Sequence, residues 1–170
     1  MTQEDKQLLL KDLCARLPYE VICDRLGNHY PLIEIDIKRE LVYLLRDDYY
    51  VPYSISRGDI IKPYLRPISS MSNEEVDKLF SILNIDEEVA TEWLKVNNTN
   101  VIRLFTQEGK DFYEIAEAMD YLYSIHIDFR GLIEKGLALE APKDMYKEWI
   151  SIRGNLKEDK KGNIVGGLKL

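Results

Sequence analysis

The chain has 170 residues, 45% of them hydrophobic and 31% charged, which is enough to bury a core, and its net charge is −7. No apolar run approaches the roughly 18 residues that a membrane span needs, which excludes a transmembrane protein. The opening residues lack the basic start and apolar stretch of a signal peptide, and two cysteines are too few for a disulfide framework. We therefore expect a soluble, cytoplasmic protein with reduced thiols.

Charge is divided unevenly along the chain. Residues 1–150 hold 18 Lys and Arg against 28 Asp and Glu, whereas residues 151–170 hold five basic and two acidic residues. Non-specific nucleic-acid affinity comes from neutralising phosphates, which an acidic body does not do. We expect a single domain over 1–150, a flexible basic tail over 151–170, and no general nucleic-acid binding.

The spacing of apolar residues predicts a helix over 3–17. Thr2 is a suitable cap for its start, and Pro18 ends it. The apolar face carries Leu9, Leu10, Leu13, Cys14 and Leu17. The face assigned to solvent carries Glu4, Asp5, Lys6, Lys11 and Arg16.

Residues 19–55 change to the two-residue period of strands. Ile33, Ile35 and Ile37 alternate with polar residues, which predicts that these three side chains point inward. Pro52 lacks an amide hydrogen, so its strand is expected at a sheet edge. The predicted strands are 19–24, 33–38, 41–46 and 49–55. They indicate a three- or four-stranded antiparallel meander packed on the first helix.

The helical period dominates after a Pro-rich connector at 56–71. Capping boxes, Ser72 with Glu75 and Asp111 with Glu114, predict helices over 72–83 and 111–124. Shorter helical segments are expected after Asp86, over 131–135 and over 143–150, while 101–105 fits a strand or a helix. The predicted fold class is α+β: an N-terminal helix and meander over 1–55, then a mostly helical half over 72–150.

Tyrosines gather around the predicted edge strand. Tyr49, Tyr50, Tyr53 and Tyr64 lie close together among the eleven tyrosines of the chain. Tyrosine combines a large apolar ring with a polar tip, which suits interfaces, and an edge strand offers unpaired main-chain groups to another strand. This segment is the strongest indication of a partner-binding surface, and a second copy pairing through the edge strand is one such partner.

The connector places cations beside a predicted helix start. Lys62 and Arg66 precede Ser72, and free amides at a helix start favour anions. These residues suit a phosphate or an acidic segment of a partner. The alternative is a rigid Pro-bounded loop whose serines cap the helix over 72–83.

Few residues suggest catalysis or metal binding. His126 and Asp128 could supply two metal ligands, or a base with its orienting partner, but no third group lies at a diagnostic spacing. The alternative is a histidine at a helix end. Cys14 and Cys23 are expected to be small core residues. The sequence therefore predicts no catalytic residue, no metal site and no cofactor, and favours a non-enzymatic protein.

Two further patterns match the residue types of known binding sites. Aromatic residues together with Arg57, Lys62 and Arg66 could bind single-stranded nucleic acid, which the net charge makes the weakest hypothesis. The tripeptide Arg57, Gly58, Asp59 matches an adhesion motif and is interpreted as a turn.

Three segments resemble a family of short uncharacterised proteins from bacterial and phage genomes. These are EDKQLLLKDLCARLP at 4–18, IKPYLRP with SSM at 61–71, and DFRGLIEKGLALEAP at 128–142. The resemblance implies a small cytoplasmic accessory protein associated with mobile elements. No activity is known for the family, so it assigns no functional residue.

The sequence thus predicts a small accessory protein that binds an unknown protein partner. The residues expected to make the contact are Tyr49, Tyr50, Tyr53, Lys62, Tyr64 and Arg66. The alternatives are an enzyme or metal protein using His126 and Asp128, and a weak binder of single-stranded nucleic acid.

Overall fold

The computed structural model describes residues 1–55, 61–85, 111–147, 157–158 and 164–165. The chain forms two compact units, Met1–Glu140 and Ala141–Leu170, which are described separately. Expectations that lie outside the described residues are the tripeptide at 57–59, the segment after Asp86, residues 101–105, the end of the 143–150 turn and most of the 151–170 tail.

The first unit begins with the predicted helix, α1 (Gln3–Arg16). Thr2 and Asp5 form a reciprocal capping box: the Asp5 amide donates to the Thr2 hydroxyl, and the Thr2 amide donates to the Asp5 carboxylate. Two such bonds satisfy amides that a helix start leaves without partners. Pro18 lies in the short 3-10 helix η1 (Leu17–Tyr19), which ends α1 as expected.

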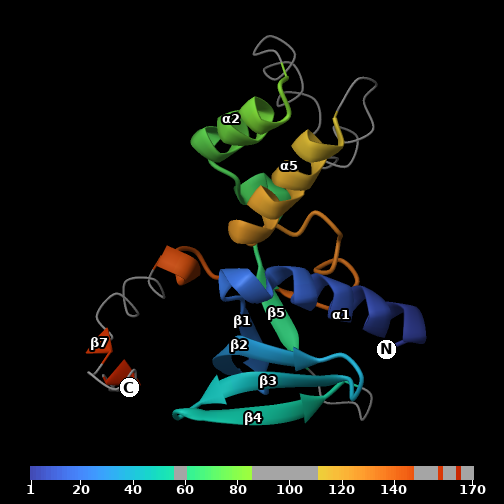
Figure 1. Ribbon diagram of the computed structural model, residues 1–170, viewed down its shortest axis with the longest axis vertical. Coiled ribbons are helices and arrows are strands. Elements are labelled where there is room, and N and C mark those ends of the chain that lie inside the picture. The colour runs from blue at the N-terminus through green and yellow to red at the C-terminus, as the bar shows by residue number, and fades with distance from the viewer. Residues whose placement is uncertain (56–60, 86–110, 148–156, 159–163, 166–170) are drawn as a thin grey trace. The chain divides into compact units, whose positions relative to one another are not determined.

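This unit contains a six-stranded sheet, of which Figure 1 labels β1 to β5. Its strands lie in the order β4-β3-β2-β1-β5-β6, and neighbours are antiparallel except for β5 and β6. The strands are β1 (Ile22–Arg25), β2 (Asn28–Asp36), β3 (Leu41–Arg46), β4 (Tyr49–Ser54), β5 (Lys62–Leu65) and β6 (Leu139–Glu140). The predicted α+β class and meander are confirmed, and β4 lies at the edge that Pro52 indicated.

The strand count corrects the prediction of three or four. Residues 62–65, expected in the connector, form β5 and pair with β1, where Pro63 lies opposite Cys23. Proline is depleted in strands because it cannot donate to the ladder. The prolines at 63 and 67 therefore concealed a strand whose pairing with β1 spans only two residue pairs.

A β-bulge alters the inward face of β2. The register with β3 shifts between Leu32 and Glu34, so one residue is added to the alternation. Leu32 is buried and Ile35 packs against the core, whereas Ile37 is 62% exposed in the turn that follows. The expectation that Ile37 points inward was wrong because the strand ends at Asp36.

Two predicted helices follow the short 3-10 helix η2 (Ile68–Ser70). Helix α2 (Asn73–Ile82) and helix α5 (Phe112–Ser124) each begin with the expected capping box. Helix makes up about half of the described residues over 72–147, so this half is not clearly mostly helical. Residues 132–136 form turns between Gly131 and Gly136, which both have positive φ angles, so the segment predicted as a helix over 131–135 is not helical.

Two hydrophobic clusters fill this unit. The first joins α1 to the inner face of the sheet and is centred on Leu13, Leu44 and Leu65. The second lies between α2 and α5 and is centred on Leu79 and Leu122. Cys23 is fully buried in the first cluster and Cys14 is partly buried, broadly as the sequence indicated.

The second unit has few described residues. Residues 145–147 are helical, as expected for a last helical turn. Strands β7 (Lys157–Glu158) and β8 (Ile164–Val165) pair in an antiparallel hairpin.

Candidate functional site

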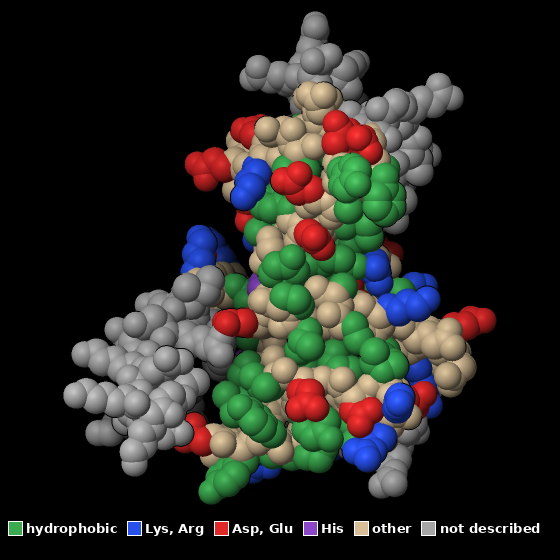
Figure 2. Space-filling view, viewed as in Figure 1, with side chains coloured by type: hydrophobic (Ala, Val, Ile, Leu, Met, Phe, Trp, Pro, Cys, Tyr) green, Lys and Arg blue, Asp and Glu red, His purple; other side chains and the backbone are tan. Residues whose placement is uncertain are grey.

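The Tyr-rich segment forms β4 and is the most exposed aromatic part of the sheet. Tyr49 is 74% exposed and Tyr50 is 64% exposed. The register sets Tyr50 opposite Leu45 and Pro52 opposite Tyr43, and these four side chains are at least partly exposed. Figure 2 shows hydrophobic side chains gathered over the end of the sheet where β3 and β4 meet. An apolar rim therefore borders the open edge.

Main-chain groups of β4 point alternately toward β3 and away from it. The Ile55 amide donates to the Glu40 carbonyl at 3.0 Å, so the main-chain groups of Ile55 point toward the β3 side. Facing and outward pairs alternate in antiparallel strands. By this alternation, the main-chain groups of Tyr53 point toward β3, whereas those of Tyr50 and Pro52 point away from it. Because β4 ends the strand order, the outward groups have no strand beside them among the described residues.

Tyr53 belongs to the fold more than to the rim. Its side chain is half-buried and packs against the α1–sheet cluster. The guanidinium of Arg25 lies 5.4 Å from its ring centroid, a cation–π contact within the chain. Tyr49, Tyr50 and Tyr53, which the sequence treated alike, therefore have different surroundings.

Tyr64 is buried and does not join the rim. It lies on β5, is 8% exposed, and its hydroxyl lies 3.3 Å from the Asp24 carboxylate and 3.0 Å from His29 Nε2. Burial, followed by the charge of Asp24, raises the pKa of the Tyr64 phenol. Tyr64 and His29 meet edge to face, with ring centroids 4.9 Å apart. The expectation of a contact residue is corrected: this tyrosine joins β5 to β1 and β2.

The connector cations also differ from each other. Lys62 lies on β5 opposite Asp24 and is partly exposed. Arg66 binds Glu75 with two hydrogen bonds of 2.7 and 2.8 Å and donates to the Ser70 carbonyl at 2.9 Å. The Glu75 hydrogen bond raises the pKa of Arg66. Arg66 thus already has an acidic partner inside the chain, contrary to the expectation that it would bind an outside one.

The serines before α2 make hydrogen bonds within the loop and at the helix start, as in the alternative of a capping loop. Ser72 caps α2, and the Ser70 hydroxyl donates to the Pro67 carbonyl at 2.7 Å. The Ser72 amide donates to Glu75, the same residue that binds Arg66. The capping box thus satisfies the amides of Ser72 and Glu75 with groups of this chain, in agreement with the alternative of a loop whose serine caps the helix.

The sequence did not indicate a buried ion pair between Asp12 and Arg16. Both residues are fully buried, and Arg16 Nε lies 2.6 Å from the Asp12 carboxylate. Arg16 also donates to the Ile127 carbonyl at 2.8 Å, and its guanidinium lies 5.0 Å from the Tyr123 ring centroid. The i, i+4 spacing could have revealed the pair, but the charged composition of this face placed Arg16 in solvent.

His126 and Asp128 are buried in a structural segment. The Asp128 carboxylate accepts hydrogen bonds from the amides of Leu132 and Ile133 at 2.9 and 2.8 Å. Burial, followed by the charges of Arg16 and Arg66, lowers the pKa of His126 to about 3. No cluster of three or more metal-ligating side chains occurs in the part of the chain that the structure describes.

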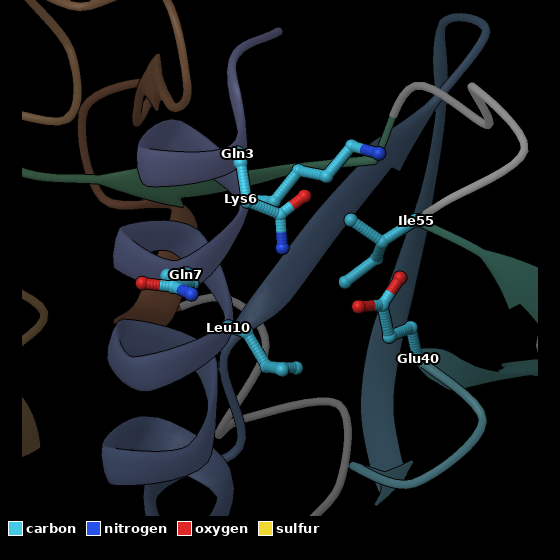
Figure 3. Close-up of a pocket in the computed structure, with 6 residues that line it drawn as sticks. All are labelled: Gln3, Lys6, Gln7, Leu10, Glu40 and Ile55. Carbon is cyan, nitrogen blue, oxygen red and sulfur yellow. The ribbon is translucent and has the colours of Figure 1, made fainter.

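A small hollow lies between α1 and the sheet (Figure 3). Its volume is about 20 Å³, room for about one water molecule. Figure 3 shows the side chains that line it: Gln3, Lys6, Gln7, Leu10, Glu40 and Ile55. Small-molecule sites measure roughly 300–1,000 Å³, so this hollow is far smaller than a typical ligand site.

A second exposed aromatic pair lies at the start of α5. Phe112 is 76% exposed and Tyr113 is 79% exposed, with ring centroids 6.2 Å apart. The sequence analysis did not predict this exposed pair. The available signal was that both aromatic residues fall outside the apolar stripe of the predicted helix. Figure 2 shows acidic side chains gathered around α2 and α5. Glu117 and Asp120 on α5 are exposed.

Comparison with known proteins gives no relative. No protein-family model, no curated protein and no solved structure matches the chain. The resemblance carried by the three segments therefore stays a prediction. Within the described ranges, none of the helices is both long enough and apolar enough to cross a membrane.

Proposed function

We propose that this protein is a non-enzymatic binding module that recognises another protein through the open edge of its sheet. The observation that carries the proposal is the exposure of Tyr49 and Tyr50 on an edge strand. Tyrosine is enriched in the buried centres of interfaces, because its ring gives a large contact area at little entropy cost.

The contact surface is narrower than the sequence indicated. Arg66 and Tyr64 have partners inside the chain, and Tyr53 packs on the core. The proposed surface consists of Tyr49 and Tyr50, with the flanking side chains of Leu45 and Pro52. We call it the β4 rim.

The proposed setting is the cytoplasm. Cys14 and Cys23 are free thiols, which suits a reducing compartment. The role of an accessory protein associated with mobile elements is supported only by the resemblance of the three sequence segments.

Affinity purification with three versions of the full chain tests the proposal. The wild type is compared with the double variant Tyr49→Ala, Tyr50→Ala and with Tyr113→Ala, which removes an equally exposed tyrosine from α5. We expect the double variant to lose proteins that wild type and Tyr113→Ala both retain, with association weaker by roughly tenfold or more. Equal recovery by all three versions would contradict the proposal.

A further inference from the structure

We infer that the partner of the β4 rim is a second copy of this chain, paired antiparallel through β4 with Tyr50 opposite Tyr50. This inference rests on the proposed function, because it names the partner of the same surface. It follows from where Pro52 lies on the open edge and from where β4 begins.

Pro52 restricts every strand that pairs with this edge. Its main chain points outward, so a residue placed opposite it can donate to its carbonyl but receives no hydrogen bond in return. A carbonyl buried between two strands without a donor is costly. A well-matched partner strand therefore ends before the position opposite Pro52.

β4 itself is such a strand. It begins at Tyr49, because Asp47 and Asp48 form a turn with φ angles of 48° and 67°, outside the extended region. When Tyr50 lies opposite Tyr50, the position opposite Pro52 is taken by Asp48, which is in the turn and not in the strand. The two copies then exchange two hydrogen bonds between Tyr50 amides and carbonyls, and no strand carbonyl faces Pro52.

The next two symmetric registers along the strand are less favourable. With Val51 at the centre, the Tyr50 carbonyl of each copy faces the nitrogen of Pro52, which cannot donate. With Pro52 at the centre, each Pro52 carbonyl faces the Pro52 nitrogen of the other copy, which cannot donate. The Tyr50-centred register avoids both conflicts.

The same register covers both exposed tyrosines. Tyr50 and its counterpart lie side by side on one face of the joined sheet, and Tyr49 lies against Val51 of the other copy on the opposite face. Aromatic–aromatic and aromatic–β-branched pairs are among the favourable cross-strand pairs. Four rings bury about 600–1,000 Å², less than the roughly 1,200–2,000 Å² of stable complexes. We therefore expect a weak dimer that forms as concentration rises.

Sedimentation of the full chain from micromolar to millimolar concentration measures the dimer. We expect wild type and Tyr113→Ala to associate alike, and the double variant Tyr49→Ala, Tyr50→Ala to associate at least roughly tenfold more weakly. A wild type that stays monomeric, or a double variant that associates like wild type, overturns the inference. If the double variant still loses a different protein in affinity purification, the proposed function stands without self-pairing.

Cysteine cross-linking tests the register. Opposite residues in a hydrogen-bonded pair lie about 5.5 Å apart between Cα atoms, within the roughly 4.4–6.8 Å that a disulfide spans. Tyr50→Cys is therefore expected to form an intermolecular disulfide quickly. Tyr49→Cys, equally exposed but diagonal to its counterpart, and Tyr113→Cys, on α5, give the matched controls, with wild type as the blank for Cys14 and Cys23. Cross-linking of Tyr49→Cys or Tyr113→Cys as fast as Tyr50→Cys overturns this register.

Discussion

Strands β4 and β5 carry similar aromatic and proline residues but have opposite surroundings. β4 ends the strand order and leaves Tyr49 and Tyr50 exposed, whereas β5 lies between β1 and β6 and buries Tyr64. Arg66, directly after β5, is bound to Glu75. The comparison shows that position in the sheet, rather than composition, decides whether the tyrosines of a Tyr-Pro segment are exposed or buried.

The largest expected effect on stability concerns the buried Asp12–Arg16 pair. Arg16 also donates to the carbonyl of Ile127, the residue that forms a β-bridge with Arg66. Arg16→Met leaves the Asp12 carboxylate buried without its cation, so we expect a loss of about 3–5 kcal/mol in the free energy of unfolding. The double variant Asp12→Leu, Arg16→Met removes both charges and is expected to recover much of that loss. Urea unfolding measures both values, and equal losses for both variants would show that the charge pairing is not the cause.

Arg66 separates the two strands as binding candidates. Arg66→Ala removes the two hydrogen bonds that Arg66 donates to Glu75, and we expect a loss of about 1–3 kcal/mol in the free energy of unfolding, toward the lower end because the guanidinium is partly exposed. Arg39→Ala is the matched control, since Arg39 pairs with Asp36 at 3.5 Å but is 75% exposed. We expect under about 0.5 kcal/mol there. Equal effects in thermal and urea unfolding would refute an internal role for Arg66.

Buried His126 makes the free energy of unfolding depend on pH. Its pKa in the folded chain is about 3, against 6.5 ordinarily, so below pH 6.5 the unfolded chain binds a proton that the folded chain does not. Stability is therefore lost as pH falls from 6.5 toward 3, at up to about 1.4 kcal/mol per pH unit. His126→Asn, which tolerates the positive φ angle at this position, should flatten the upper part of this curve. Parallel curves for both proteins between these pH values would contradict the assignment.

Removing single hydroxyls compares the two strands most directly. Tyr64→Phe deletes the bonds to Asp24 and His29, and we expect a loss of about 1 kcal/mol. Tyr50→Phe deletes an exposed hydroxyl, so we expect a change within about 0.5 kcal/mol. Thermal unfolding at one pH compares them, and a larger effect at Tyr50 would reverse the interpretation of both strands.

Local patterns predicted much of this fold. The Thr2 cap and the capping boxes at Ser72 and Asp111 located three helix starts, because each depends on residues about three apart in the sequence. Pro52 located the edge strand because a missing amide hydrogen is a property of the residue itself.

Long-range partners could not be predicted in the same way. Nothing in the segment at 62–65 indicates that β1 and β6 flank it, so Tyr64 and Arg66 were assigned to the surface. Arg16 was assigned to solvent because its contact with Ile127 is made 111 residues along the chain. The exposure of Tyr49 and Tyr50 could be predicted, because it follows from their place on an edge strand. The burial of Tyr64 could not, because it depends on the strands that pair with β5.

Pro52 also affects the tendency of this edge strand to aggregate at high protein concentration. The segment from Tyr49 to Ser54 is uncharged and rich in β-forming residues, the composition that stacks into fibrils when every backbone group can bond to a chain above and below. A proline in its middle interrupts that repeat at each layer. The residue that limits this edge to a short pairing thereby also acts as a gatekeeper against open-ended aggregation.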